Sequence, residues 1–224
     1  MNWIVPRSAA AALCGALVST SCAANSPSAA RQIESAVGIV ATGCSLVAQL
    51  GSGVVLESAG RIVTVAHTIA GASEIAVVDS DGTEHIARVM AFDKDSDLAV
   101  LDAPTIGVEP LMLGAITVGP AYLFVWSRNG GTEAKPVEVL KRLRITIEDI
   151  YIDEIVQRTG LEIEGDVEIG DSGGAIVSDR GKVMGIVYAN SRERGSVGFA
   201  TDVAEIRDVL SSAAADPVPN GRCS

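Results

Sequence analysis

The chain has 224 residues, which is enough for one sizeable domain or two small ones that share a core. Hydrophobic residues make up 48% and charged residues 20%, so the composition excludes an intrinsically disordered chain. The 17 Lys and Arg against 28 Asp and Glu give a net charge of -11, which repels phosphate backbones and excludes nucleic acid as a partner. After the N-terminus, no uncharged apolar run reaches the roughly 18 residues of a membrane span.

The first residues have the pattern of an export signal. Arg7 precedes the small and apolar run 8–18, and small polar residues follow. Cleavage after Ala24 would define a signal peptide over 1–24 and leave 25–35 as a linker. In the alternative route the signal ends before Cys22, which is then lipidated, and this lipid would be the one membrane anchor. Either route predicts an extracellular, cell-surface or periplasmic protein.

Export simplifies the cysteine pattern. Cys14 lies in the signal, and Cys22 is either removed or lipidated. Cys44 and Cys223 then remain as an even pair in an oxidising compartment, which favours a disulfide between them over two buried thiols.

The exported part begins with a run of short predicted strands. An Asp-Gly pair at 81–82 is a strong hairpin signal, and a second turn is predicted at 57–60. We expect this run to form one β-barrel over 36–110. Its predicted strands are 37–40, 45–50, 53–56, 61–65, 75–78, 85–89 and 98–101.

A second run of strands follows a proline-bounded crossing at 104–110. We expect it to form a second barrel over 111–210, ending in a helix at 202–210 with Asp202 as N-cap and Glu205 three residues on. A tail over 211–224 carries Cys223. The sequence therefore predicts an all-β protein with two packed six-stranded barrels and a short C-terminal helix. The predicted strands of this run are 122–126, 137–147, 150–156, 161–169, 174–177 and 183–187.

Three polar residues stand at strand edges in the order His, Asp, Ser. His67 follows a buried strand, Asp97 directly precedes the apolar run 98–101, and Ser172 lies in the glycine-bracketed turn 170–174. A serine in such a turn can expose its Oγ beside free backbone N–H groups, and an aspartate can orient an imidazole. The other histidine, His85, is interpreted as a solvated strand residue. No Cys/His cluster has metal-ligand spacing, so no metal or cofactor is predicted.

The segments around these residues, 51–67, 97–101, 170–174, 183–187 and 198–201, resemble the bacterial trypsin-like serine proteases. Cys44 just before Gly-Ser-Gly and Cys223 at the far end are similar to the actinobacterial MarP-like periplasmic proteases. The resemblance implies a two-barrel chymotrypsin fold and a Cys44–Cys223 disulfide. Asp171 departs from that family, which usually has Asn before the serine, and Ala175 stands where Pro is usual.

The resemblance also implies a role for each site residue. Ser172 would be the nucleophile, His67 the general base and Asp97 its orienting acid, with the N–H groups of Gly170 and Ser172 as the oxyanion hole. It places the substrate-binding region at the residues Asp166, Ile169, Tyr188 and Ala189. Asp166 lies where trypsin-like enzymes place the acid that selects Lys or Arg. The alternative interpretation is that Asp166 is a solvated strand residue.

The resulting expectation is a monomeric serine endopeptidase that acts on proteins or peptides. Two alternatives stay open. The chain could be an exported two-barrel protein that binds a partner without cleaving it. It could also be a latent protease, because an Asp at the position of Asp171 can receive a freshly cut amine, which Ile39-Val40 would supply.

Overall fold

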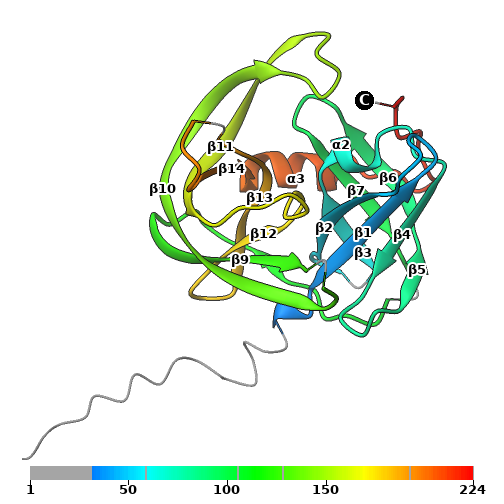
Figure 1. Cartoon of the computed structure of the whole chain (residues 1–224), viewed down its shortest axis with the longest axis horizontal. Coiled ribbons are helices and arrows are strands. Elements are labelled where there is room, and N and C mark those ends of the chain that lie inside the picture. Colours follow the sequence, from blue (N-terminus) through cyan, green and yellow to red (C-terminus); the bar gives the residue numbers. More distant parts are fainter. Residues whose placement is uncertain (1–31, 59, 105, 128, 192, 224) are drawn as a thin grey trace, which may run out of the picture.

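The computed structural model describes residues 32–58, 60–104, 106–127, 129–191 and 193–223. Two barrels of strands lie side by side, and one helix, α3 (Val203–Ser211), runs between them (Figure 1). The predicted all-β fold with two barrels and a C-terminal helix is confirmed. The predicted signal peptide, Cys14 and Cys22 lie outside the described residues.

The first barrel is a seven-stranded sheet with the order β5-β4-β1-β2-β3-β7-β6. A short helix, α2 (Ala66–Ile69), follows β3 at one end of this sheet. Two predicted boundaries are wrong here: the strands expected at 45–50 and 53–56 form the single strand β2, and the strand expected at 85–89 divides at Ala87 into β5 and β6. The sheet therefore has seven strands, whereas the barrel was predicted to have six. The strands are β1 (Ala36–Thr42), β2 (Gln49–Val55), β3 (Arg61–Thr64), β4 (Glu74–Val78), β5 (Glu84–Ile86), β6 (Arg88–Asp93) and β7 (Leu98–Asp102).

The second barrel has the order β12-β9-β10-β11-β14-β13-β8, and pairing of β12 with β13 closes the ring. The predicted strand at 150–156 is wrong in its first five residues, because 149–154 form the turn between two long strands, β10 and β11. The strands are β8 (Met112–Leu113), β9 (Gly119–Trp126), β10 (Thr132–Glu148), β11 (Ile155–Gly165), β12 (Ala175–Ser178), β13 (Lys182–Asn190) and β14 (Val197–Asp202).

Apolar side chains form three clusters, one inside each barrel and one between them. The cluster between the barrels joins Val54 and Val100 of the first to Ile186 of the second, together with Ile206 and Leu210 of α3. Burial of these side chains is the main favourable term that holds the barrels together.

Helix α3 begins as predicted. The side chain of Asp202 accepts a hydrogen bond from the backbone N–H of Ala204 at 2.8 Å and so caps the helix. Glu205 does not complete a capping box. Its carboxylate instead accepts from the backbone N–H of Thr159, at 2.8 Å, and ties the helix to β11.

Cys44 and Cys223 form the predicted disulfide, with their Cα atoms 5.6 Å apart. The tail is also held by hydrogen bonds, because Asn220 bonds Ile69, Gly71 and Ala72 directly after α2. No helix within the described ranges is long and apolar enough to cross a membrane.

Candidate active site

His67 is fixed by two contacts with one carboxylate. It lies on α2, the short helix that follows β3, and it lines the cleft between the barrels. Its Nδ1 lies 2.8 Å from Oδ2 of Asp97, and its backbone N–H donates to Oδ1 of the same residue at 2.9 Å. This geometry orients the imidazole so that Nε2 is left for another partner.

Asp97 occupies the turn between β6 and β7 in a left-handed conformation, with φ of 57°. Few residues other than glycine adopt this region, although aspartate tolerates it better than most. Its carbonyl accepts from the N–H of Ala66 at 3.2 Å, and the residue is 4% exposed. The surrounding structure therefore holds a strained backbone in order to aim this carboxylate at His67.

A buried cation lies behind the Asp97 carboxylate. The guanidinium of Arg158, from β11, is 4.0 Å from Asp97 Oδ2 and 5.0 Å from the centre of the Tyr188 ring. It donates to the carbonyl oxygens of Ser96 and Glu148 at 3.3 and 3.4 Å. Its side chain is 3% exposed, so its charge acts on the pair of Asp97 and His67 with little screening.

The pKa of His67 results from opposing effects. Burial lowers the pKa, but the hydrogen bond and the negative charge of Asp97 together raise it above 6.5, and the charge of Arg158 limits the rise. The contact with Asp97 therefore favours the protonated imidazole, the form that a general base reaches when it accepts a proton.

Ser172 lies in a loop that glycine makes possible. Gly170 and Gly173 have φ of 106° and 91°, and a Cβ on Gly173 would overlap the carbonyl oxygen of Ser52. The backbone N–H groups of Gly170 and Ser172 donate to no group in the described part of the chain. These two donors are therefore available to a ligand.

Ser52 of β2 connects this loop to the first barrel. Its backbone N–H donates to the carbonyl of Ser172 at 2.8 Å, and its Oγ donates to the carbonyl of Gly170 at 3.1 Å. The same Oγ accepts from the N–H of Trp126 at 3.1 Å. Ser52 is fully buried, so it fixes the serine loop relative to the barrel that carries His67 and Asp97.

The cleft between the barrels holds a pocket of about 510 Å³ that both His67 and Ser172 line. Among the hydrogen bonds of the described residues, none joins these two side chains. Catalytic hydrogen bonds of this kind often tighten only when substrate binds. The pocket thus brings together a base and a hydroxyl beside free N–H donors.

Three of the four residues expected to bind substrate line this pocket, and the fourth does not. Ile169, Tyr188 and Ala189 line the pocket, together with Val167. Asp166 is exposed and is not among the lining residues. His85, interpreted as solvated, is instead only partly exposed and bonds Asp79 Oδ2 through Nε2 at 2.9 Å.

Asp171 is a buried carboxylate with a cationic partner. Its Oδ2 lies 3.0 Å from Nζ of Lys135, and the two side chains are 8% and 11% exposed. Ile39 and Val40, which the latent-protease alternative needs at a free end, lie within β1 and pair there with β2 and β4.

Sequence reasoning missed Ser52, Arg158 and Lys135. A serine between two glycines in a buried strand was a usable signal for Ser52. Arg158 and Lys135 lie in polar strand segments where a basic residue reads as solvated, so nothing local marked them.

The sequence comparisons agree with this geometry. A family model described as the trypsin-like peptidase domain matches residues 51–186, so the chain belongs to the trypsin-like peptidases. Serine protease Rv3671c of Mycobacterium tuberculosis is 32% identical over 178 residues, which cover 77% of this chain and 44% of the relative. Protease Do-like 1 of Arabidopsis thaliana is 30% identical, over 71% of this chain and 38% of its own length. The chain thus spans less than half of these relatives.

Solved structures give the same result. The crystal structure of the active form of Rv3671c overlaps with a TM-score of 0.82 at 30% identity, covering 88% of each chain. Its inactive form overlaps with a TM-score of 0.73 at 29% identity, covering 84% of this chain and 93% of that one. Rv3671c is the MarP protease, so the predicted resemblance to the MarP-like proteases is confirmed.

Proposed function

We propose that the chain is an exported serine endopeptidase that hydrolyses peptide bonds in proteins or peptides through Ser172, His67 and Asp97. The observation that carries the proposal is that Asp97 orients His67, which lines one pocket together with Ser172 and Gly170. The backbone N–H groups of Gly170 and Ser172 have no acceptor among the described residues. Membership of the trypsin-like peptidases supports the same function.

In the first step, Ser172 Oγ attacks the scissile carbonyl carbon while Nε2 of His67 takes the hydroxyl proton. The electron pair of the carbonyl moves to its oxygen, where the N–H groups of Gly170 and Ser172 stabilise the charge. Asp97 stabilises the resulting imidazolium. His67 then gives its proton to the leaving amine, and the C–N bond breaks to leave an acyl-enzyme.

In the second step, water attacks the acyl-enzyme along the same path. His67 takes a proton from the water, and a second oxyanion forms in the same hole. Collapse of this intermediate breaks the bond to Ser172 Oγ, which recovers the proton from His67. The products are the two peptide fragments, and the enzyme is regenerated.

Export is the second half of the proposal. It rests on the signal pattern over 1–24, with Cys22 as the candidate for lipidation, and on the Cys44–Cys223 disulfide, which needs an oxidising compartment. A relative in Halomonas elongata, 30% identical over 71% of this chain and 34% of its own length, is named a probable periplasmic serine endoprotease.

Turnover of casein or a fluorogenic peptide tests the catalytic proposal. Ser172→Ala should leave a folded protein whose turnover falls by roughly 10⁶, because the nucleophile is removed. The control Ser58→Ala changes an exposed serine in a turn of the first barrel and should keep the wild-type rate.

Two results would favour the alternatives. A folded wild-type protein that cleaves nothing and whose pocket binds peptide would indicate a binding protein. Turnover that appears only after the N-terminus is cut before Ile39 would indicate a latent protease, although that cut would remove part of β1.

A further inference from the structure

Asp171 stands between the two N–H donors of the proposed oxyanion hole. Gly170 precedes it and Ser172 follows it, so the contacts of its side chain anchor the segment that carries both donors. Its Oδ2 accepts from the backbone N–H of Glu168 at 2.8 Å, and its own N–H donates to the carbonyl of Glu168 at 3.1 Å. These bonds close a tight turn directly before the serine.

Both carboxylate oxygens of Asp171 also accept hydrogen bonds from the ammonium group of Lys135. Nζ of Lys135 lies 3.0 Å from Oδ2 and 3.3 Å from Oδ1 of Asp171, and 3.0 Å from Oε2 of Glu168. Lys135 comes from β10, where it pairs with Leu123 of β9. A strand of the barrel wall thus holds the ammonium under the serine loop.

The charge of Lys135 is maintained by these partners. Partial burial alone lowers the pKa of its ammonium, but the hydrogen bonds to Glu168 and Asp171 raise the pKa above 10.5. Glu168 is 66% exposed, whereas Asp171 is 8% exposed, so the contact with Asp171 is the one that water screens little.

We propose that Lys135 is a positioning residue for the oxyanion hole, which its ammonium holds in the competent conformation through Asp171. This inference rests on the proposed peptidase function. Because the counter-charge belongs to the folded barrel, the loop needs no newly cut N-terminus to order it.

Removal of the ammonium leaves Asp171 as a buried charge without a counter-charge, since the backbone N–H of Glu168 is then its remaining partner among the described residues. Such a charge is costly, so the carboxylate is expected to turn toward water. That movement rotates the Asp171–Ser172 peptide, which carries the N–H of Ser172. It also shifts Gly170, and with it the Ile169–Gly170 peptide that carries the N–H of Gly170, so both donors move off their target. Because these donors act mainly on the transition state, the loss should appear in kcat and much less in KM.

The test compares Lys135→Met, Lys135→Arg and the control Lys141→Met. Lys141 lies on the same strand and pairs with Glu162, but its side chain is 60% exposed. We expect Lys135→Met to lower kcat on the order of 10²-fold, with KM within about 3-fold of wild type. Its affinity for a peptide aldehyde, which mimics the oxyanion, should fall by the same factor as kcat. Lys135→Arg should restore most of the loss, and Lys141→Met should behave as wild type.

The double variant Lys135→Met with Asp171→Asn tests whether the effect passes through Asp171. With both charges gone, no buried charge lacks a partner, so kcat should be higher than in Lys135→Met alone. The double variant also tests the proposal if Lys135→Met alone fails to fold. A double variant that folds but is no more active than Ser172→Ala, or a folded Lys135→Met with the kcat of wild type, would overturn the proposal.

Amide hydrogen exchange separates this inference from the proposed function. Exchange of residues 168–173 should rise in Lys135→Met and not in Lys141→Met, whether or not the protein cleaves peptides. Wild-type protein that is inactive but shows this difference would contradict the peptidase function alone. Unchanged exchange in Lys135→Met would contradict the positioning role.

Discussion

Asp97 combines three features in one residue: a left-handed backbone, burial, and a double contact with His67. Strain of this kind persists only where neighbouring contacts over-determine the conformation. Here the contacts come from Ala66 in the first barrel and from Arg158 in the second. The orientation of the base therefore depends on both barrels.

Asp97→Asn should keep the fold and lower turnover by roughly 10⁴, because the amide stabilises the wrong tautomer of His67. Asp95→Asn is the matched control in the same turn. Asp95 is 53% exposed, and Lys94 is the one partner of its side chain among the described residues, so its loss should leave turnover close to wild type. Steady-state kinetics on both variants check the assignment, and a large loss in Asp95→Asn alone would move the acid to Asp95.

The pH dependence of kcat/KM reports the protonation of His67. The imidazolium cannot accept a proton from Ser172, so activity should fall as the pH drops through a pKa that lies above 6.5. The charged groups that face His67 are Asp97, which raises this pKa, and Arg158, which lowers it.

Arg158→Met should therefore move the acid limb of the profile to higher pH. Arg158→Lys keeps the positive charge and should leave the limb near its wild-type position. The control Arg88→Gln removes an exposed cation that pairs with Asp102, and it should not shift the limb. A limb that stays in place or moves to lower pH in Arg158→Met would contradict this electrostatic role.

The candidate triad was predictable from residue types at strand edges, because His67, Asp97 and Ser172 each follow or precede a clear local pattern. The residues that hold them were not. Arg158 and Asp97 are 61 positions apart, and Lys135 and Asp171 are 36 apart. Arg158 meets Asp97 because the second barrel packs against the first, and Lys135 meets Asp171 because the second barrel closes on itself. No short sequence window contains that information.

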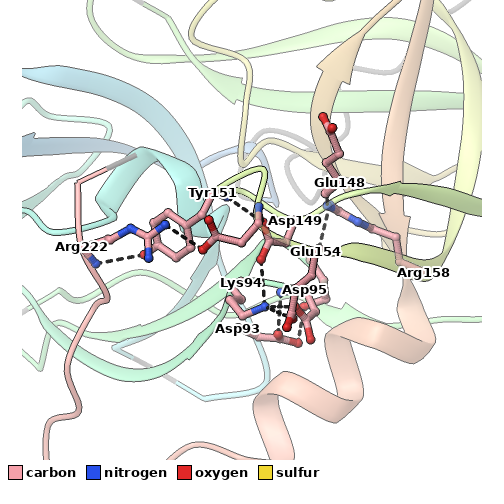
Figure 2. A network of polar contacts seen from close by, with 11 residues as sticks. Asp93, Lys94, Asp95, Glu148, Asp149, Tyr151, Glu154, Arg158 and Arg222 are labelled. Carbon is pink, nitrogen blue, oxygen red and sulfur yellow. Dashed lines mark hydrogen bonds and ion pairs between the residues drawn. The ribbon is translucent and has the colours of Figure 1, made fainter.

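At the scale of elements, the turn between β10 and β11 links the two barrels. Figure 2 shows Nζ of Lys94, from the turn that also carries Asp97, among three carboxylates. It lies 2.7, 2.8 and 2.9 Å from Asp95, Asp149 and Glu154. The ammonium supplies the positive charge that this acidic group needs.

Acid should weaken this link in a defined window. The hydrogen bond from Lys94 lowers the pKa of Asp149 to about 2, below its ordinary 3.8. A lowered pKa means that the contribution to stability is complete above the ordinary pKa and is lost as the pH falls toward 2. The Tm of wild type should therefore fall between about pH 4 and pH 2 more steeply than that of Asp149→Asn. Thermal melts at several pH values check this, and the same dependence of Tm on pH in both proteins would contradict a contribution of Asp149 to stability.

Element boundaries were predicted less well than element types. The apolar residues of 150–156 suggested a strand, but Asp149 accepts hydrogen bonds from the N–H groups of Tyr151 and Asp153 and so forms a turn. The division at Ala87 was equally hidden, because its N–H bonds Ile75 of β4 while the following residues pair with β7. In both places tertiary hydrogen bonds override local propensity.

At the scale of the whole molecule, residues 220–223 tie together segments that lie far apart in the sequence. Cys223 is bonded to Cys44 across 179 positions, and Asn220 and Arg222 bind the loop after α2 and the turn at Tyr151. The tail thus packs beside the helix that carries His67 and beside the turn that links the barrels. Its hydrogen bonds do not involve the disulfide, so we expect them to remain when the disulfide is reduced.

Reduction of the disulfide should lower stability more than turnover. Chain entropy for a loop of this length gives at most about 5 kcal/mol, which corresponds to a Tm lower by up to about 10–20 °C. Initial turnover should change little, because Asn220 still holds the loop after α2. Melts and prompt assays of the variant Cys44→Ala with Cys223→Ala check both statements. An immediate large loss of turnover in a folded protein would mean that the disulfide shapes the site.

The central claim is that Ser172 is an activated nucleophile. Mass spectrometry of the protein after treatment with a fluorophosphonate tests it directly, because only an activated serine reacts at an appreciable rate. The account predicts one adduct per chain, mapped to Ser172 and lost in both Ser172→Ala and His67→Ala. A folded wild-type protein with no adduct, or with its adduct on another serine, would contradict the claim.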